Sequence, residues 1–198
     1  MMRGVFFGIM TIANQITIAR ILLIPVFVLF SIYYGKSVEA GVPLEWQRLV
    51  AIGVFILAAC TDGIDGYVAR RWNQRSRLGA LLDPIADKGL LLTAIITLSL
   101  THWTHSLPLW FAVLVIARDA LILLGCGLLY YFHQNLEVRP SFSGKATTTF
   151  QMMAVAMIML QLPSYLVLVY VAGIFTFISG AEYLIRGISQ LRHNEKTQ

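Results

Sequence analysis

Four aspartates in an otherwise apolar stretch are the residues of this sequence whose type and spacing best suit chemistry. Asp62 and Asp65 are three residues apart, and Asp83 and Asp87 are four apart. Each spacing places the two members of a pair on the same face of a helix. The turn between the pairs is short and basic, so we expect two antiparallel neighbouring helices on which the four carboxylates converge.

Carboxylates gathered in an apolar setting must be neutralised. One aspartate at membrane depth costs about 2.5–3.5 kcal/mol on insertion scales, and several close together also repel one another. Carboxylate oxygens favour Mg²⁺, Mn²⁺ or Ca²⁺ over zinc, so the pattern predicts a site for one or two divalent cations. The alternative is a network of ion pairs at the membrane interface, with Arg70, Arg71, Arg75, Arg77 and Lys88 as partners.

Glycines and an arginine lie among these acids. Glycine in a helix costs about 1 kcal/mol relative to alanine, so Gly63, Gly66 and Gly79 indicate that another group approaches the backbone closely. Close helix packing is the alternative explanation. Arg70 lies one turn and a residue beyond Asp65, where a guanidinium could hold a phosphate. Together these features predict phosphate-transfer chemistry assisted by metal ions.

The elements that must position these residues are membrane helices. The 198 residues are 58% hydrophobic and only 13% charged, with a mean hydropathy of +0.73, whereas soluble domains carry about a quarter charged residues. This composition excludes a soluble enzyme, a nucleic-acid-binding domain and a disordered chain. A bilayer core needs roughly 20 apolar residues per helix. We therefore predict an all-α bundle of six spans, at residues 16–34, 49–68, 83–100, 107–132, 147–162 and 165–185.

The distribution of Lys and Arg predicts how these spans cross the membrane. The connection after the second span holds four arginines, whereas residues 101–106, after the third, hold no Lys or Arg. The positive-inside rule therefore places both termini in the cytoplasm. Residues 1–12 are apolar but too short to span, so we expect a retained interfacial helix rather than a signal peptide. With no repeat or linker, residues 1–198 are expected to form a single membrane domain.

The acidic segment also carries a family resemblance. It matches every defined position in the signature of the CDP-alcohol phosphatidyltransferases, as Asp62-x2-Asp65-Gly66-x2-Ala69-Arg70-x8-Gly79-x3-Asp83-x3-Asp87. Upstream, Asn14-x2-Thr17-x2-Arg20 before Ile24-Pro25 is similar to the first span of bacterial members that act on glycerol 3-phosphate. The run from Leu82 to Lys88 is similar to the same members.

The resemblance implies a metal site and a reaction. Asp62, Asp65 and Asp83 would ligate a first metal ion, and Asp65, Asp83 and Asp87 a second, with Mg²⁺ or Mn²⁺ expected. Asp87 matches the proposed general base, which takes a proton from the acceptor hydroxyl. That oxygen attacks the lipid-linked phosphorus of CDP-diacylglycerol, and CMP leaves.

The resemblance also implies a donor site and a setting. Gly66, Arg70 and Ser76 match positions that hold the cytidine diphosphate part of CDP-diacylglycerol. A homodimer in the bacterial cytoplasmic membrane is expected.

A second polar cluster, in the fourth and fifth spans, concerns the acceptor. Arg118 and Asp119 lie midway along an apolar run, and Lys145 lies where the fifth span opens. One interpretation is a structural ion pair of Arg118 with Asp119, with Lys145 only marking a helix end. The other is that Arg118 and Lys145 bind a phosphate of the acceptor.

Two acceptors carry such a phosphate, glycerol 3-phosphate and phosphatidylglycerol. The segments 117–119 and 139–142 look closer to the cardiolipin synthases of mitochondrial type, which use phosphatidylglycerol. The bacterial size and the lack of a transit sequence favour glycerol 3-phosphate, which would yield phosphatidylglycerophosphate. An intramembrane ion or solute transporter is a third possibility, because intramembrane Asp and Arg also mark transport pathways. A transporter would be expected to show a repeat, and the acidic motif has no second copy in the sequence.

Overall fold

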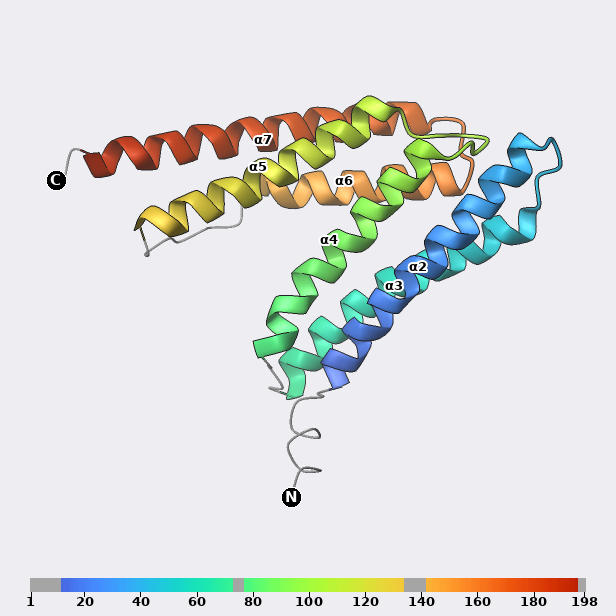
Figure 1. The fold of residues 1–198 in the computed structure, drawn as a ribbon, viewed down its shortest axis with the longest axis horizontal. Helices are drawn as coiled ribbons and strands as arrows, with labels where there is room; N and C mark the ends of the chain where they lie inside the picture. Colours follow the sequence, from blue (N-terminus) through green and yellow to red (C-terminus); the bar gives the residue numbers. More distant parts are fainter. Residues whose placement is uncertain (1–11, 73–76, 134–141, 196–198) are drawn as a thin grey trace, which may run out of the picture. The chain divides into compact units, whose positions relative to one another are not determined.

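The computed structural model describes residues 12–72, 77–133 and 142–195, with side chains for residues 15, 17–61, 86, 88–125 and 143–185. Over these residues the protein is all-helical, as expected. The helices, labelled as in Figure 1, are α2 (Ile12–Glu39), α3 (Glu45–Trp72), α4 (Arg77–Leu100), α5 (Leu109–His133), α6 (Phe142–Met159) and α7 (Tyr165–Glu195).

Each expected span overlaps a different helix, but the bounds differ. The expected spans 16–34, 49–68, 83–100 and 165–185 lie inside their helices, whereas 107–132 begins two residues before α5 and 147–162 ends three residues after α6. Within the described residues, two segments are long and apolar enough to cross a membrane, Thr17–Glu39 and Tyr165–Ile185, and Lys88–Leu100 is a shorter apolar segment. The all-α class is therefore confirmed, and six membrane crossings stay a prediction. The predicted interfacial helix at residues 1–12 lies almost wholly outside the described residues.

Two of the helix ends are closed by the same hydrogen-bond pattern. After α2, the N–H of Val42 donates to Ser37 O and that of Gly41 to Val38 O. Gly41 has a φ of 75°, the left-handed conformation that this Schellman cap requires. The end of α6 is capped in the same way, but there Gln161 takes the left-handed position, with a φ of 55°.

The chain divides into two compact units, of which the first is Met1–Ser106. In it, α2 packs against α3 and α4, and α3 also contacts α4. Phe27 and Phe55 join α2 to α3, with ring centroids 5.7 Å apart. The connection after α4 is held to α2 by Trp103, whose Nε1 donates to Ser31 O at 3.1 Å. These contacts fix the helices that carry the four aspartates.

The second unit, Leu107–Gln198, contains α5, α6 and α7, with α7 packed against both of the others. Phe150 of α6 stacks on Phe175 of α7 with centroids 4.7 Å apart. On the α5 side, a Cβ at Gly173 would lie 3.0 Å from two ring atoms of Trp110, so the glycine admits the indole. The predicted single domain over residues 1–198 stays a prediction.

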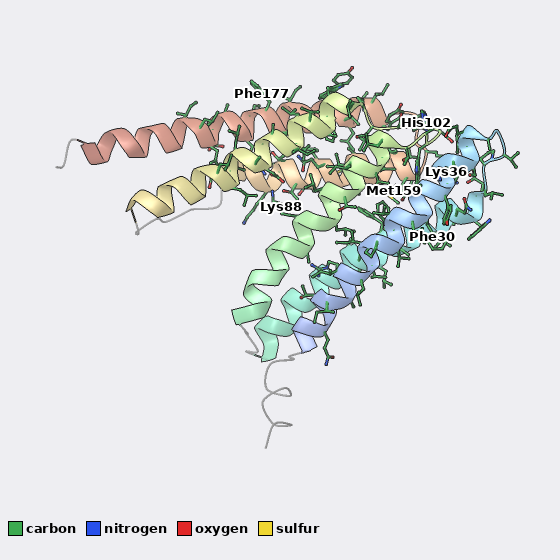
Figure 2. All side chains as sticks on the ribbon, in the orientation of Figure 1. Phe30, Lys36, Lys88, His102, Met159 and Phe177 are labelled. Carbon is green, nitrogen blue, oxygen red and sulfur yellow. The ribbon has the colours of Figure 1, made fainter. Side chains whose placement is uncertain are left out.

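Large apolar side chains are exposed on helices of both units. Leu22, Leu123, Phe177 and Ile185 are 64–74% exposed, and Figure 2 labels Phe177 on α7. Apolar surface is stabilised by about 25 cal/mol per Å² when it leaves water. Such surfaces therefore suit contact with lipid chains.

Candidate active site

The backbone of α3 and α4 brings the two aspartate pairs to matching levels. The two helices are in contact, and the end of α3 lies near the start of α4 in Figure 1. Asp62 lies ten residues before Trp72 and Asp87 ten residues after Arg77, so each is about 15 Å from its helix end. Asp65 and Asp83 are each about 10 Å from those ends by the same measure. We call these four residues the aspartate site.

The remaining positions of the signature lie on the same two helices or in the connection between them. Gly66 and Arg70 belong to the last turns of α3. Ser76 lies outside the described residues, and the side chains of Arg70 and of the aspartate site lie outside the described side chains. Their roles therefore stay predictions that rest on backbone placement.

Arg20 of α2 is a buried polar residue that contacts α3. The side chain is fully buried, and its Nε donates to Thr61 Oγ1 at 3.4 Å. Thr61 immediately precedes Asp62, and its own hydroxyl donates to Ala58 O at 2.6 Å. In the sequence, Arg20 stood out only as part of the family resemblance. The signal available was an arginine inside the apolar run of α2.

Arg118 of α5 forms a polar centre in the second unit. Its side chain is only 9% exposed and pairs with Asp119, with Nη1 2.7 Å from Oδ1. Nη2 donates to Ser179 Oγ of α7 at 2.8 Å. Nε is buried and has no hydrogen-bond partner among the described groups. The ion pair considered from the sequence is therefore present, and one buried donor of the guanidinium is left over.

Two glycines admit the Arg118 side chain between helices. A Cβ at Gly144 of α6 would lie 3.3 Å from Arg118 Nη2, and one at Gly180 of α7 would lie 3.5 Å from Arg118 Cγ. Lys145, next to Gly144, is exposed. The structure thus places the Gly144 backbone beside the guanidinium but leaves the Lys145 side chain on the surface.

The start of α6 is tied to α7 by further polar contacts. Ser143 Oγ donates to Glu182 Oε2, Thr147 Oγ1 donates to Phe175 O at 3.0 Å, and Gln151 Nε2 donates to Thr176 Oγ1 at 2.9 Å. The α7 members of this cluster were not predicted from the sequence. The available signal was Ser179 and Glu182, three residues apart on one face of an apolar helix.

Comparison with known sequences shows which family carries this arrangement. The sequence profile of the CDP-alcohol phosphatidyltransferases matches residues 10–178, which include the aspartate site and Arg118. The chain belongs to the CDP-alcohol phosphatidyltransferase family. It is similar to the CDP-diacylglycerol–glycerol-3-phosphate 3-phosphatidyltransferases of Escherichia coli K12 and of Shigella flexneri serotype 5b. Each is 35% identical over 181 residues, covering 87% of this chain and 92% of the relative. The predicted enzyme class, a transferase, is thereby confirmed.

Members of this family are generally dependent on a divalent metal ion. Among the described side chains, no three His, Cys, Asp or Glu residues gather to hold one. The side chains of the aspartate site are not among those described. The positions of its four residues place two aspartates on each of two contacting helices. An all-oxygen donor set of this kind fits Mg²⁺ or Mn²⁺.

Proposed function

We propose that this protein transfers the phosphatidyl group of CDP-diacylglycerol to glycerol 3-phosphate, forming phosphatidylglycerophosphate and CMP. The observation that carries the chemistry is the register of the aspartate site on α3 and α4, inside the segment that matches the family. The relatives, which match 87% of this chain, are named for glycerol 3-phosphate as acceptor, and this supports the same acceptor here. Family membership also argues against an intramembrane transporter.

The proposed donor site uses both contacting helices of the first unit. Asp62, Asp65 and Asp83 would hold one divalent ion, and Asp65, Asp83 and Asp87 would hold a second. When bound, such ions offset the charge of the pyrophosphate and of the CMP leaving group. Asp87 takes the proton of the acceptor hydroxyl, the new bond forms between that oxygen and the lipid-linked phosphorus, and the bond from phosphorus to CMP breaks. A ligated carboxylate is a weak base, so its contribution depends on placement.

The donor's nucleotide part is assigned to the turns that follow the first aspartate pair. Gly66 lets the backbone approach the ligand, and Arg70 offers a planar fork of N–H donors that matches a phosphate. Ser76 offers a hydroxyl from the connection after α3. The order of these residues along the chain supports this assignment, because they lie between the two aspartate pairs.

The proposed acceptor site uses Arg118 and Lys145. The buried Nε of Arg118 is a donor that an acceptor phosphate would satisfy, and a buried donor without a partner costs about 1–3 kcal/mol. Because Asp119 already offsets the Arg118 charge, capture of a dianionic phosphate also needs the exposed cation of Lys145. Glycerol 3-phosphate suits these residues because its phosphate is dianionic and would accept a hydrogen bond from Arg118 Nε.

The proposed setting is the bacterial cytoplasmic membrane. Six crossings, both termini in the cytoplasm, a single membrane domain and a homodimer complete the proposal. The exposed apolar side chains on α2, α5 and α7 support a lipid environment. The four arginines within residues 70–77, where α3 ends and α4 begins, support its orientation, because basic segments stay on the cytoplasmic side.

The test supplies one acceptor at a time. Purified full-length protein in mixed micelles receives CDP-diacylglycerol, Mg²⁺ and either glycerol 3-phosphate or phosphatidylglycerol, and both CMP and the lipid product are measured. Phosphatidylglycerophosphate from glycerol 3-phosphate is the expected product. Cardiolipin from phosphatidylglycerol, with no turnover of glycerol 3-phosphate, would overturn the acceptor assignment and leave the donor chemistry standing.

A further inference from the structure

Arg20 is a fully buried cation within an apolar helix. Residues 21–28 that follow it on α2 are uncharged, and its side chain has no exposed surface. Its contact with Thr61 Oγ1 satisfies a donor but offsets no charge, because the hydroxyl is neutral. Burying an uncompensated charge is strongly unfavourable. A carboxylate must therefore offset Arg20.

The helix register limits which carboxylates of the first unit can do so. Glu39 is nineteen residues further along α2, about 28 Å away. Glu45 is sixteen residues before Thr61 on α3, about 24 Å away, and it pairs with Arg48 at 2.6 Å. The other four carboxylates of this unit are the aspartate site, and Asp62 directly follows Thr61.

We propose that Arg20 is the internal counter-cation of the aspartate site, fixed to the Asp62 end of α3 through Thr61. Arg20 is thus a positioning residue, which offsets the repulsion among the four carboxylates when no divalent ion is bound. This inference rests on the proposed metal site and goes beyond it, since it assigns a role to α2.

A counter-cation differs from a purely structural arginine in how it changes the effect of metal binding on stability. A fixed positive charge stabilises the metal-free site and lessens what a divalent ion adds on binding. Removal of that charge should therefore destabilise the metal-free protein more than the metal-bound protein. Whatever binds only the folded state stabilises it according to its affinity, so the same change should tighten metal binding.

Thermal unfolding with and without metal tests this coupling. Wild type, Arg20→Gln and Arg20→Lys are melted as full-length proteins in detergent, in EDTA and in saturating Mn²⁺, without substrate. Arg20→Gln keeps an N–H donor for Thr61 but loses the charge. We expect Mn²⁺ to raise its Tm by about 3 °C more than it raises that of wild type. Arg20→Lys should keep the wild-type rise.

Trp103→Phe is the matched control. It removes the hydrogen bond from Nε1 to Ser31 O, in the connection that follows α4. Its Tm should fall equally in EDTA and in Mn²⁺. An equal fall for Arg20→Gln in the two conditions would overturn the proposal, because that result is the behaviour of a residue that only packs.

Two further measurements keep the proposal open to refutation if Arg20→Gln folds poorly. Titration of free Mn²⁺ by electron paramagnetic resonance should show binding tighter by about fivefold in Arg20→Gln than in wild type. The double variant Arg20→Gln with Asp62→Asn should melt in EDTA at a higher temperature than Arg20→Gln alone, since one repelling carboxylate is gone. Unchanged Mn²⁺ affinity, or no recovery in the double variant, would contradict the counter-cation.

The same titration separates this inference from the proposed function. If wild type itself bound no Mn²⁺, the metal site would fail, and the comparison of Arg20→Gln with the double variant in EDTA would still decide whether Arg20 offsets Asp62. If wild type and Arg20→Gln bound Mn²⁺ equally, the metal site would stand and the role of Arg20 would fall.

Discussion

At the scale of the residue, Asp65 is one of the two carboxylates, with Asp83, that both proposed metal ions would share. Asp65→Asn keeps the size of the side chain but removes a negative charge from a bridging position. We expect CMP release to fall by about a hundredfold or more, because electrostatic stabilisation of the transferred phosphate is lost. Glu39→Gln, an exposed acid at the end of α2, is the matched control and should retain activity. Near-full activity of Asp65→Asn would refute the two-metal site.

Arg118 permits a sharper test of the acceptor than simple truncation does. Arg118→Lys keeps a cation to pair with Asp119 but loses the planar fork that also reaches Ser179. We expect the KM for glycerol 3-phosphate to rise about tenfold, the equivalent of about 1.4 kcal/mol, with the KM for CDP-diacylglycerol unchanged. Ser179→Ala should show a smaller rise in the same KM. A parallel change in both KM values would point to a general loss of folding instead.

The site residues differ in how far they could be predicted from the sequence. The aspartate site could be predicted from the spacing of its residues and from the family signature, because carboxylates are rare within apolar segments. Ser179 and Glu182 were missed because their partners, Arg118 and Ser143, come from helices more than thirty residues away in the sequence. The burial of Arg20 was likewise set by packing between α2 and α3, which spacing within one helix does not reveal.

At the scale of the element, two glycines test the backbone of the first unit without any steric contribution. An added Cβ meets nothing within 4 Å at Gly41 or at Gly53. Gly41 caps α2 with a φ of 75°, whereas Gly53 lies within α3. Gly41→Ala should lower the free energy of unfolding by about 1 kcal/mol, since alanine disfavours the left-handed region. Gly53→Ala should raise it by up to about 1 kcal/mol. Thermal melts of both variants measure the difference, and equal shifts would contradict the cap assignment.

Helix existence was predictable from apolar runs, but helix ends were not. The predicted second span ends at residue 68, whereas α3 continues to Trp72. A run of apolar residues shows which part of a helix suits a lipid environment, but it does not show where the helix ends. The predicted fifth span covers 147–162, whereas α6 runs from Phe142 to Met159. Its end is set by the left-handed Gln161, a position that a sequence reader assigns to glycine.

At the scale of the whole molecule, the chain joins two units, each with three helices among its described residues, that carry different proposed tasks. The first holds the aspartate site and Arg20, and the second holds Arg118 with its contacts to α6 and α7. The family match runs through both units, from residue 10 to residue 178. Donor activation and acceptor capture are thus assigned to different parts of one chain, so variants in the two parts should separate kinetically, as the Asp65 and Arg118 predictions state.

The predicted orientation of the chain in the membrane can be tested in intact cells. Arg75, in the basic connection outside the described residues, should face the cytoplasm, where CMP is released and glycerol 3-phosphate is found. Val42, in the connection between α2 and α3, should face outward. In a background lacking Cys60 and Cys126, Val42→Cys should react with an impermeant thiol reagent applied to whole cells, and Arg75→Cys should react only after the cells are opened. Labelling of Arg75→Cys from outside would invert the topology, because the basic connection and the nucleotide product would then lie on the wrong side.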